Sequence, residues 1–194
     1  MATPDAITLL REDHATVRKL FKDFFKAGDR AYATRRRIAG RIITELSTHA
    51  GIEEAVFYPR VRVAVPRADQ DVLESLEEHH IVKWTCSELE GMNPREERFA
   101  AKMQVLMERV THHMKEEETG LFPEVRRAFS RADLVAMGDD LRAARTAVPK
   151  RPHPRAPDQP PGNIAAAMVS APVDELVKNV RTAVRKGAKA VVGG

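Results

Sequence analysis

Apolar residues recur every three or four positions along most of the chain, and this spacing predicts α-helices. The first predicted helix carries a histidine within its apolar stripe, which consists of Ile7, Leu10, His14, Val17, Phe21 and Phe24. Thr3, Pro4 and Asp5 are typical of a helix start, with a capping hydroxyl, a proline and an acid. Gly28 ends this first helix.

Four further helices are predicted in the first 147 residues. They span about residues 30–57, 69–90, 94–128 and 130–147. Pro59 and Pro66 mark the break after the first of these, and Gly91 ends the next. Ser130 and Asp133 have the form of a capping box with aspartate in the acidic position, which places the start of the last helix.

The chain contains an internal duplication. The segment 49–59, which reads HAGIEEAVFYP, is matched at an offset of 64 residues by the segment 113–123, which reads HMKEEETGLFP. Upstream, the Asp-His pair at residues 13–14 corresponds to the Glu-His pair at residues 78–79. Two αα-hairpins in tandem predict an all-α protein with an up-down-up-down four-helix bundle, related by a pseudo-two-fold axis.

The repeated segments bring polar groups to the inner faces of these helices. Histidine and glutamate four residues apart lie on the same helix face, so both reach one point in the core. The predicted metal-binding set is His14, His49, Glu53, His79, His113 and Glu117. Two carboxylates buried alone are too costly, so they either pair with imidazolium groups or bind metal. Four imidazoles and two bridging carboxylates suit a pair of metal ions, with iron favoured over manganese or zinc.

Two adjacent-histidine pairs leave a choice of ligand. We predict His79 over His80, because the helix face of His79 is the more apolar and matches the repeat offset. We predict His113 over His112, whose partner at the fourth position would be Glu116 and whose flanks are charged. His112 is therefore expected in solvent, and His153 is not expected to be a ligand because it lies in the Pro-rich linker.

These motifs resemble the hemerythrin-like HHE cation-binding domain of the bacterial type, over about residues 5–147. The resemblance implies a non-haem di-iron centre with an oxo or hydroxo bridge. It implies O₂ binding in the oxygen carriers, and sensing or peroxide and NO chemistry in bacterial members. The carriers have a further histidine four residues after the equivalent of His79, and this chain has Lys83 there.

That difference leaves the complete ligand set open. An additional ligand, or an outer hydrogen-bonding partner, would be His80, Tyr58, Glu54, Glu118 or a solvent molecule. A site with fewer histidines and more anionic or open positions holds ferric iron better and leaves room for peroxide.

The expected function is a soluble di-iron protein that binds O₂ or reactive oxygen species. Its most enzyme-like form is catalase-like disproportionation of H₂O₂. The alternatives are a module that senses O₂, NO or redox state, and an iron-handling protein without catalysis.

Composition and charge add a domain boundary and a location. Residues 149–194 carry eight basic and three acidic side chains, whereas the first 148 carry 24 basic and 25 acidic ones, so we expect no nucleic-acid binding by the bundle. We predict a metal-binding bundle at 1–147, a Pro-rich linker at 148–163 and a basic amphipathic helix at 164–194. Four roles stay open for that helix: docking on the bundle, pairing with a second copy to form a homo-oligomer, contact with an acidic membrane, and no fixed contact. A single cysteine and no apparent signal peptide or membrane span predict a cytoplasmic protein.

Overall fold

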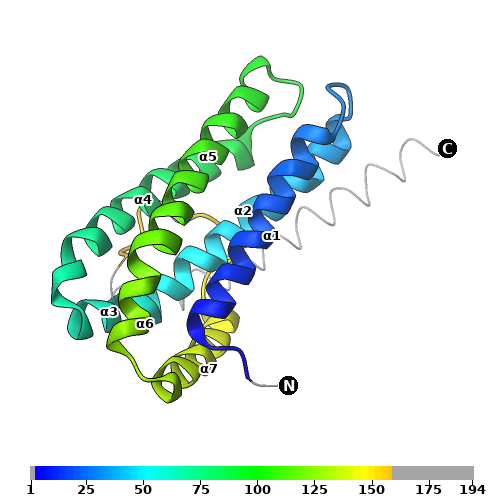
Figure 1. The fold of residues 1–194 in the computed structure, drawn as a ribbon. Helices are drawn as coiled ribbons and strands as arrows, with labels where there is room; N and C mark the ends of the chain where they lie inside the picture. The colour runs from blue at the N-terminus through cyan, green and yellow to red at the C-terminus, as the bar shows by residue number, and fades with distance from the viewer. Residues whose placement is uncertain (1–2, 159–194) are drawn as a thin grey trace.

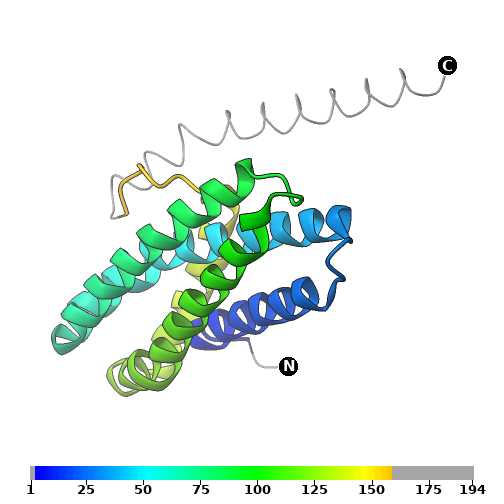
Figure 2. The same cartoon turned by 90° about the horizontal axis from the view of Figure 1, so that it is seen from above.

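The computed structural model describes residues 3–158, and the predicted C-terminal helix lies outside them. Four long helices form the bundle: α1 (Ala6–Lys26), α2 (Tyr32–Ile52), α4 (Asp69–Gly91) and α5 (Glu97–Glu116). As Figures 1 and 2 show, α1 and α2 form one antiparallel hairpin and α4 and α5 the other, with both connecting loops at the same end. The predicted all-α bundle is confirmed.

The second and fourth long helices each continue through a π-helical turn. The turns are η1 (Glu53–Phe57) and η3 (Glu117–Leu121), and they lead into α3 (Tyr58–Ala64) and α6 (Phe122–Ala128). Each turn ends two residues before a proline, Pro59 or Pro123. A proline ring clashes with the carbonyl four residues earlier in an α-helix, and a wider turn avoids that clash.

The break predicted at Pro59 was therefore wrong. Pro59 lies inside the continued helix, which runs on to Ala64. A short 3₁₀ turn, η2 (Pro66–Ala68), then leads into α4. The predicted start of α1 was also wrong in detail, because Asp5 is the N-cap and accepts a 2.8 Å hydrogen bond from the Thr8 amide.

A fifth major helix, α7 (Arg131–Ala147), crosses the end of the bundle where α1 begins (Figure 1). Its predicted capping box is present: the Ser130 hydroxyl accepts from the Asp133 amide, and the Asp133 carboxylate accepts from the Ser130 amide. Gly138 allows α7 to approach the start of α1 closely. A Cβ there would lie 3.0 Å from the Pro4 carbonyl oxygen and 3.1 Å from the Ala6 nitrogen.

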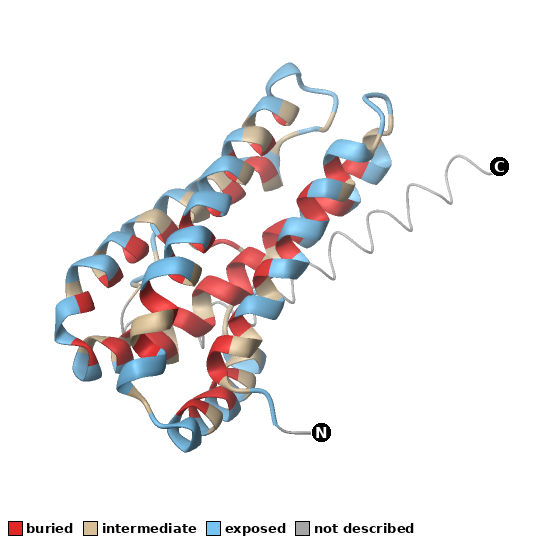
Figure 3. Ribbon diagram, viewed as in Figure 1, coloured by how far each residue is buried: buried red, intermediate tan, exposed pale blue. Residues whose placement is uncertain are grey.

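The bundle interior contains two apolar clusters with a layer of buried polar side chains between them. In Figure 3 the buried residues, in red, recur along the helices between exposed ones. One cluster includes Ile52, Phe57 and Leu141, near α7, and the other includes Phe24 and Met103, toward the hairpin loops. Cys86 is buried in the second cluster, and burial raises the pKa of its thiol to about 12. Among residues 3–158, none of the helices has the length and apolar character needed to span a membrane.

Residues 148–158, the described part of the predicted linker, lie against the outside of the bundle. Val148 packs on one apolar cluster and contacts Gly51 of α2. The Arg151 guanidinium donates to both carboxylate oxygens of Glu90 on α4, at 2.9 and 2.7 Å. Paired donors of this kind fix the orientation of both groups, so this stretch has a defined place on the bundle.

Candidate metal centre

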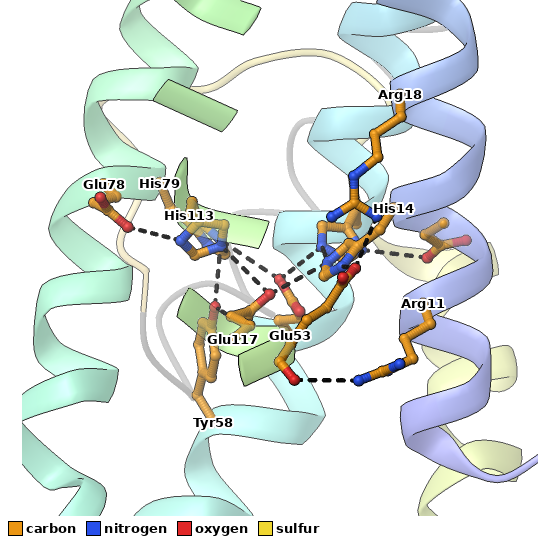
Figure 4. A network of polar contacts seen from close by, with 12 residues as sticks. Arg11, His14, Arg18, Glu53, Tyr58, Glu78, His79, His113 and Glu117 are labelled. Carbon is orange, nitrogen blue, oxygen red and sulfur yellow. Dashed lines mark hydrogen bonds and ion pairs between the residues drawn. The ribbon is translucent and has the colours of Figure 1, made fainter. Parts of the chain in front are cut away.

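Four histidines, one from each long helix, meet in the middle of the bundle (Figure 4). The Nε2 atoms of His14 and His49 lie 3.1 Å apart. The Nε2 atoms of His79 and His113 lie 3.2 Å apart. All four side chains are buried. The sequence-predicted histidines thus form two pairs, one within each hairpin.

Two buried glutamates lie between these histidine pairs. Glu53 Oε2 is 3.2 Å from Nε2 of His49 and 3.4 Å from Nε2 of His79. Glu117 Oε2 is 3.3 Å from Nε2 of His14 and 3.6 Å from Nε2 of His113. Each carboxylate therefore reaches both hairpins, which is the position of a bridging ligand.

The donor set suits two cations. His14, His49, Glu53 and Glu117 each offer an atom within 4.8 Å of the others, and Glu53, His79 and His113 form a second such group that shares Glu53. Three buried carboxylate oxygens receive no hydrogen bond from residues 3–158: both oxygens of Glu53, and Oε2 of Glu117. Buried acceptors without donors are costly, and a metal ion would satisfy them.

The outward-facing nitrogen of each imidazole contacts a carboxylate. Glu118 Oε1 lies 2.7 Å from His14 Nδ1, and Asp13 Oδ2 lies 3.3 Å from His49 Nδ1. In the other hairpin, Glu54 Oε1 lies 2.9 Å from His79 Nδ1 and Glu78 Oε2 lies 2.8 Å from His113 Nδ1. An Nδ1–H that donates to a carboxylate leaves the Nε2 lone pair free for a metal.

These outer acids are immediate sequence neighbours of the inner residues, but each serves a different histidine. Asp13 follows the pattern, since it precedes His14 and contacts His49. From the sequence we expected Glu54 and Glu118 as additional ligands or outer hydrogen-bonding partners. In the structure both contact the Nδ1 atom of a histidine. No role for Asp13 or Glu78 was predicted from the sequence. Their recurrence next to a histidine in both repeats was the available signal.

Basic side chains hold three of the four outer carboxylates. Arg18 lies 2.9 Å from Glu118, and Lys83 lies 2.7 Å from Glu54. Arg145 of α7 forms an ion pair with Asp13. Lys83, which occupies the position of the carriers' additional histidine, therefore contacts an outer acid rather than the inner group.

Burial and mutual charges shift the pKa values of the inner groups. Burial, followed by the charge of Glu117, raises the pKa of Glu53 well above its ordinary value. Burial also acts to raise the pKa of Glu117, but the charges of His113 and His14 outweigh it and hold that pKa low. Burial lowers the pKa of His49 and, more strongly, of His79. The lowered pKa values of His49 and His79 favour the neutral imidazoles that bind metal, whereas Glu53 would have to lose its proton when a metal binds.

One position breaks the pseudo-two-fold symmetry. The Tyr58 hydroxyl donates to Glu117 Oε1 at 3.0 Å and lies 3.4 Å from His79 Nε2, and burial raises the pKa of Tyr58 well above 10, so its proton stays on. The equivalent residue, Phe122, stacks on His14 with a ring-centre distance of 5.7 Å. His80 lies outside the centre: its ring is exposed and accepts a 3.0 Å hydrogen bond from the Trp84 indole.

The fold and the paired imidazole–carboxylate groups define a helical bundle built to hold cations in its interior. The model of the hemerythrin HHE cation-binding domain matches residues 5–125, and the chain belongs to that family. The resemblance identified from the sequence motifs is thereby confirmed.

Individual relatives share between 21% and 27% of their residues with this chain. An uncharacterized hemerythrin-like protein of Schizosaccharomyces pombe is 27% identical over 166 residues, which are 85% of this chain and 81% of that protein. A DNA nickase of Nostoc is 27% identical over 143 residues, and the match covers 74% of this chain but 40% of the nickase. The crystal structure of a hemerythrin HHE cation-binding domain protein from Mycobacterium kansasii has a TM-score of 0.63 at 21% identity, covering 74% of this chain and 86% of the other, and shows the shared fold.

Proposed function

We propose that the protein is a non-haem di-iron protein that binds O₂ or reactive oxygen species, and that it disproportionates H₂O₂ to water and O₂. The observation that carries this proposal is the pair of histidine pairs joined by Glu53 and Glu117. His14 and His49 would hold one ion and His79 and His113 the other, with the two glutamates shared. Imidazole and carboxylate together favour iron among the common metals.

The chain itself supplies rigid positioning. When bound, iron supplies a Lewis acid and the one-electron steps that peroxide chemistry needs. The four outer acids fix each imidazole with its Nε2 facing inward, and the basic side chains fix three of those acids in turn. Such outer hydrogen bonds typically alter metal affinity or activity by about 10- to 100-fold when removed.

The two proposed metal positions differ in the hydrogen-bond donors beside them. Tyr58 holds a proton 3.0 Å from Glu117 Oε1, beside His79. Phe122, at the equivalent position beside His14, has no proton to donate. Among residues 3–158, Tyr58 thus gives one position a hydrogen-bond donor that its counterpart lacks. A hydroxyl that keeps its proton can orient a bound peroxide by hydrogen bonding, and we propose that the half of the centre near Tyr58 is where the peroxide reacts.

The second candidate is a module that senses O₂, NO or redox state, and it rests on the docked segment 148–158. That segment connects the bundle to residues 159–194 and contacts α4, the helix that carries His79. A third candidate function is iron handling without catalysis.

Cytoplasmic location, self-association through the C-terminal segment and the exclusion of nucleic acids stay predictions. The nickase relative makes a direct DNA-binding test worthwhile.

The test is peroxide consumption by the full chain after reconstitution with iron, followed with an oxygen electrode. We expect one O₂ for every two H₂O₂ consumed. The variant His79→Ala should lose this activity together with iron, because it removes an inner imidazole.

The matched control is His80→Ala, which removes the neighbouring exposed ring and should keep both activity and iron. If the iron-loaded wild type changes its absorption spectrum with O₂ or NO but evolves no O₂ from peroxide, the catalytic proposal fails and the sensor is favoured.

A further inference from the structure

A second group of metal-binding side chains lies on the surface, where α4 meets α5. Glu78, His112 and Glu116 each offer an atom within 4.8 Å of the others. His112 Nε2 lies 3.0 Å from Glu116 Oε1, and these side chains are 60% and 52% exposed. His112 and Glu116 thus repeat the histidine–glutamate spacing of the buried centre, one residue earlier and on the outer face of α5.

The sequence pattern did not indicate that Glu78 lies beside His112 and Glu116. Glu78 comes from α4, and its Oε2 lies 2.8 Å from His113 Nδ1, which fixes the carboxylate against the buried centre. Its side chain is 20% exposed, so it has both a buried and a surface-facing environment. The cluster therefore has one fixed member and two members that solvent reaches.

The pseudo-symmetry of the bundle gives an independent reason to expect a cation here. Asp13, Glu54 and Glu118 each pair with a basic side chain. Glu78 is the fourth outer acid, and among residues 3–158 it forms no ion pair with a lysine or arginine. Glu116, which lies beside Glu78, adds a second negative charge. The charged contact of Glu116 is His112.

We propose that Glu78, His112 and Glu116 bind a divalent transition-metal cation such as Zn²⁺ or Fe²⁺, in the place that Arg145 fills beside Asp13. One imidazole and two carboxylates suit ions of this kind better than Mg²⁺ or Ca²⁺, which prefer oxygen ligands alone. Because the site is open to solvent and has three protein ligands, the ion exchanges readily. Glu78 would then contact both this ion and His113 Nδ1 of the buried centre.

The test is a calorimetric titration of Zn²⁺ into the full chain, without a polyhistidine tag and with its buried centre already holding metal. We expect one Zn²⁺ per chain. His112→Ala and Glu116→Gln should each weaken binding by about tenfold or more, as the loss of a direct ligand must exceed the effect of an outer one. Both side chains are exposed, so the variants should fold and keep their resident metal.

Two control variants are matched in type and exposure. His80→Ala removes an exposed imidazole from α4, and Glu108→Gln removes an exposed carboxylate from α5; both should bind Zn²⁺ as the wild type does. The metal content measured before and after the titration separates the two sites. The proposal fails if the wild type binds no Zn²⁺, if His112→Ala binds it unchanged, or if Zn²⁺ uptake equals the release of resident metal.

Discussion

The Nδ1 atom of each inner histidine contacts a carboxylate, and in the sequence that acid adjoins another inner residue, not the histidine it contacts. Glu54 adjoins Glu53 but contacts His79, and Glu118 adjoins Glu117 but contacts His14. Helical periodicity predicted which residues face inward, because that depends on one helix alone. It could not assign the outer contacts, because these depend on how far neighbouring helices are rotated and shifted against each other.

In the metal-free chain the pKa values of His79 and His113 should be shifted in opposite directions from the ordinary histidine value. Burial lowers the pKa of His79 well below 6.5. Burial acts the same way on His113, but the charges of Glu117 and Glu78 outweigh it and raise that pKa. His79 therefore contributes stability above about pH 6.5 that is lost as the pH falls, and His113 contributes stability below about pH 6.5 that is lost as the pH rises through its folded pKa.

Nuclear magnetic resonance of the imidazole protons, recorded from pH 8 to about pH 5, measures both titrations directly. His79 should stay neutral over most of this range while His113 becomes protonated. Single substitutions of the two residues assign the signals. Titration of both rings near the ordinary value, or in the reverse order, would show that the buried charges are arranged differently.

At the scale of elements, the two π turns are the feature that spacing arguments missed. The sequence contains both prolines, but the prediction was a break at Pro59 and an uninterrupted helix through Pro123. The chain instead widens into a π turn and continues as a helix at both places. A proline in a helical pattern is compatible with an end, a kink or a widened turn. Burial of Phe57 and Val61 on either side of Pro59 favours continuation, and that depends on partners in distant helices.

The contact between α7 and the start of α1 gives a test of packing. Gly138→Ala should lower the free energy of unfolding by about 1–3 kcal/mol, because the new methyl group overlaps the backbone of residues 4–6. Gly40→Ala is the control, since a Cβ at that helical position meets nothing within 4 Å. It should raise the stability by about 0.5–1 kcal/mol.

Urea unfolding of both variants provides the measurement. Equal effects of the two substitutions would mean that α7 does not approach α1 as closely as the structure indicates.

At the scale of the whole molecule, the linker boundary depends on contacts outside the predicted helices. Proline content predicted a linker over residues 148–163, and its described part, residues 148–158, contains no helix or strand. Composition carries no information on where such a segment lies. Val148 and Arg151 attach residues 148–158 to α2 and α4. The site residues and their outer partners all fall between residues 13 and 145.

Two truncated chains separate these roles. A chain ending at Ala147 should bind metal as a chain ending at Asp158 does, because it keeps every member of the centre. It should be less stable by about 1–3 kcal/mol, since it loses the packing of Val148 and the Arg151–Glu90 pair. Thermal unfolding and metal analysis of both chains check this. Loss of metal from the shorter chain would place the boundary of the metal-binding unit beyond residue 147.

The central proposal is that the interior of the bundle holds two metal ions and that Glu53 and Glu117 are each shared by both ions. Counting iron by elemental analysis in the reconstituted and desalted full chain tests it most directly. The account predicts two iron ions per chain, and one or none after Glu53→Ala, because that residue belongs to both groups. A wild-type chain that retains a single ion under iron saturation, or a Glu53→Ala chain that retains two, would contradict it.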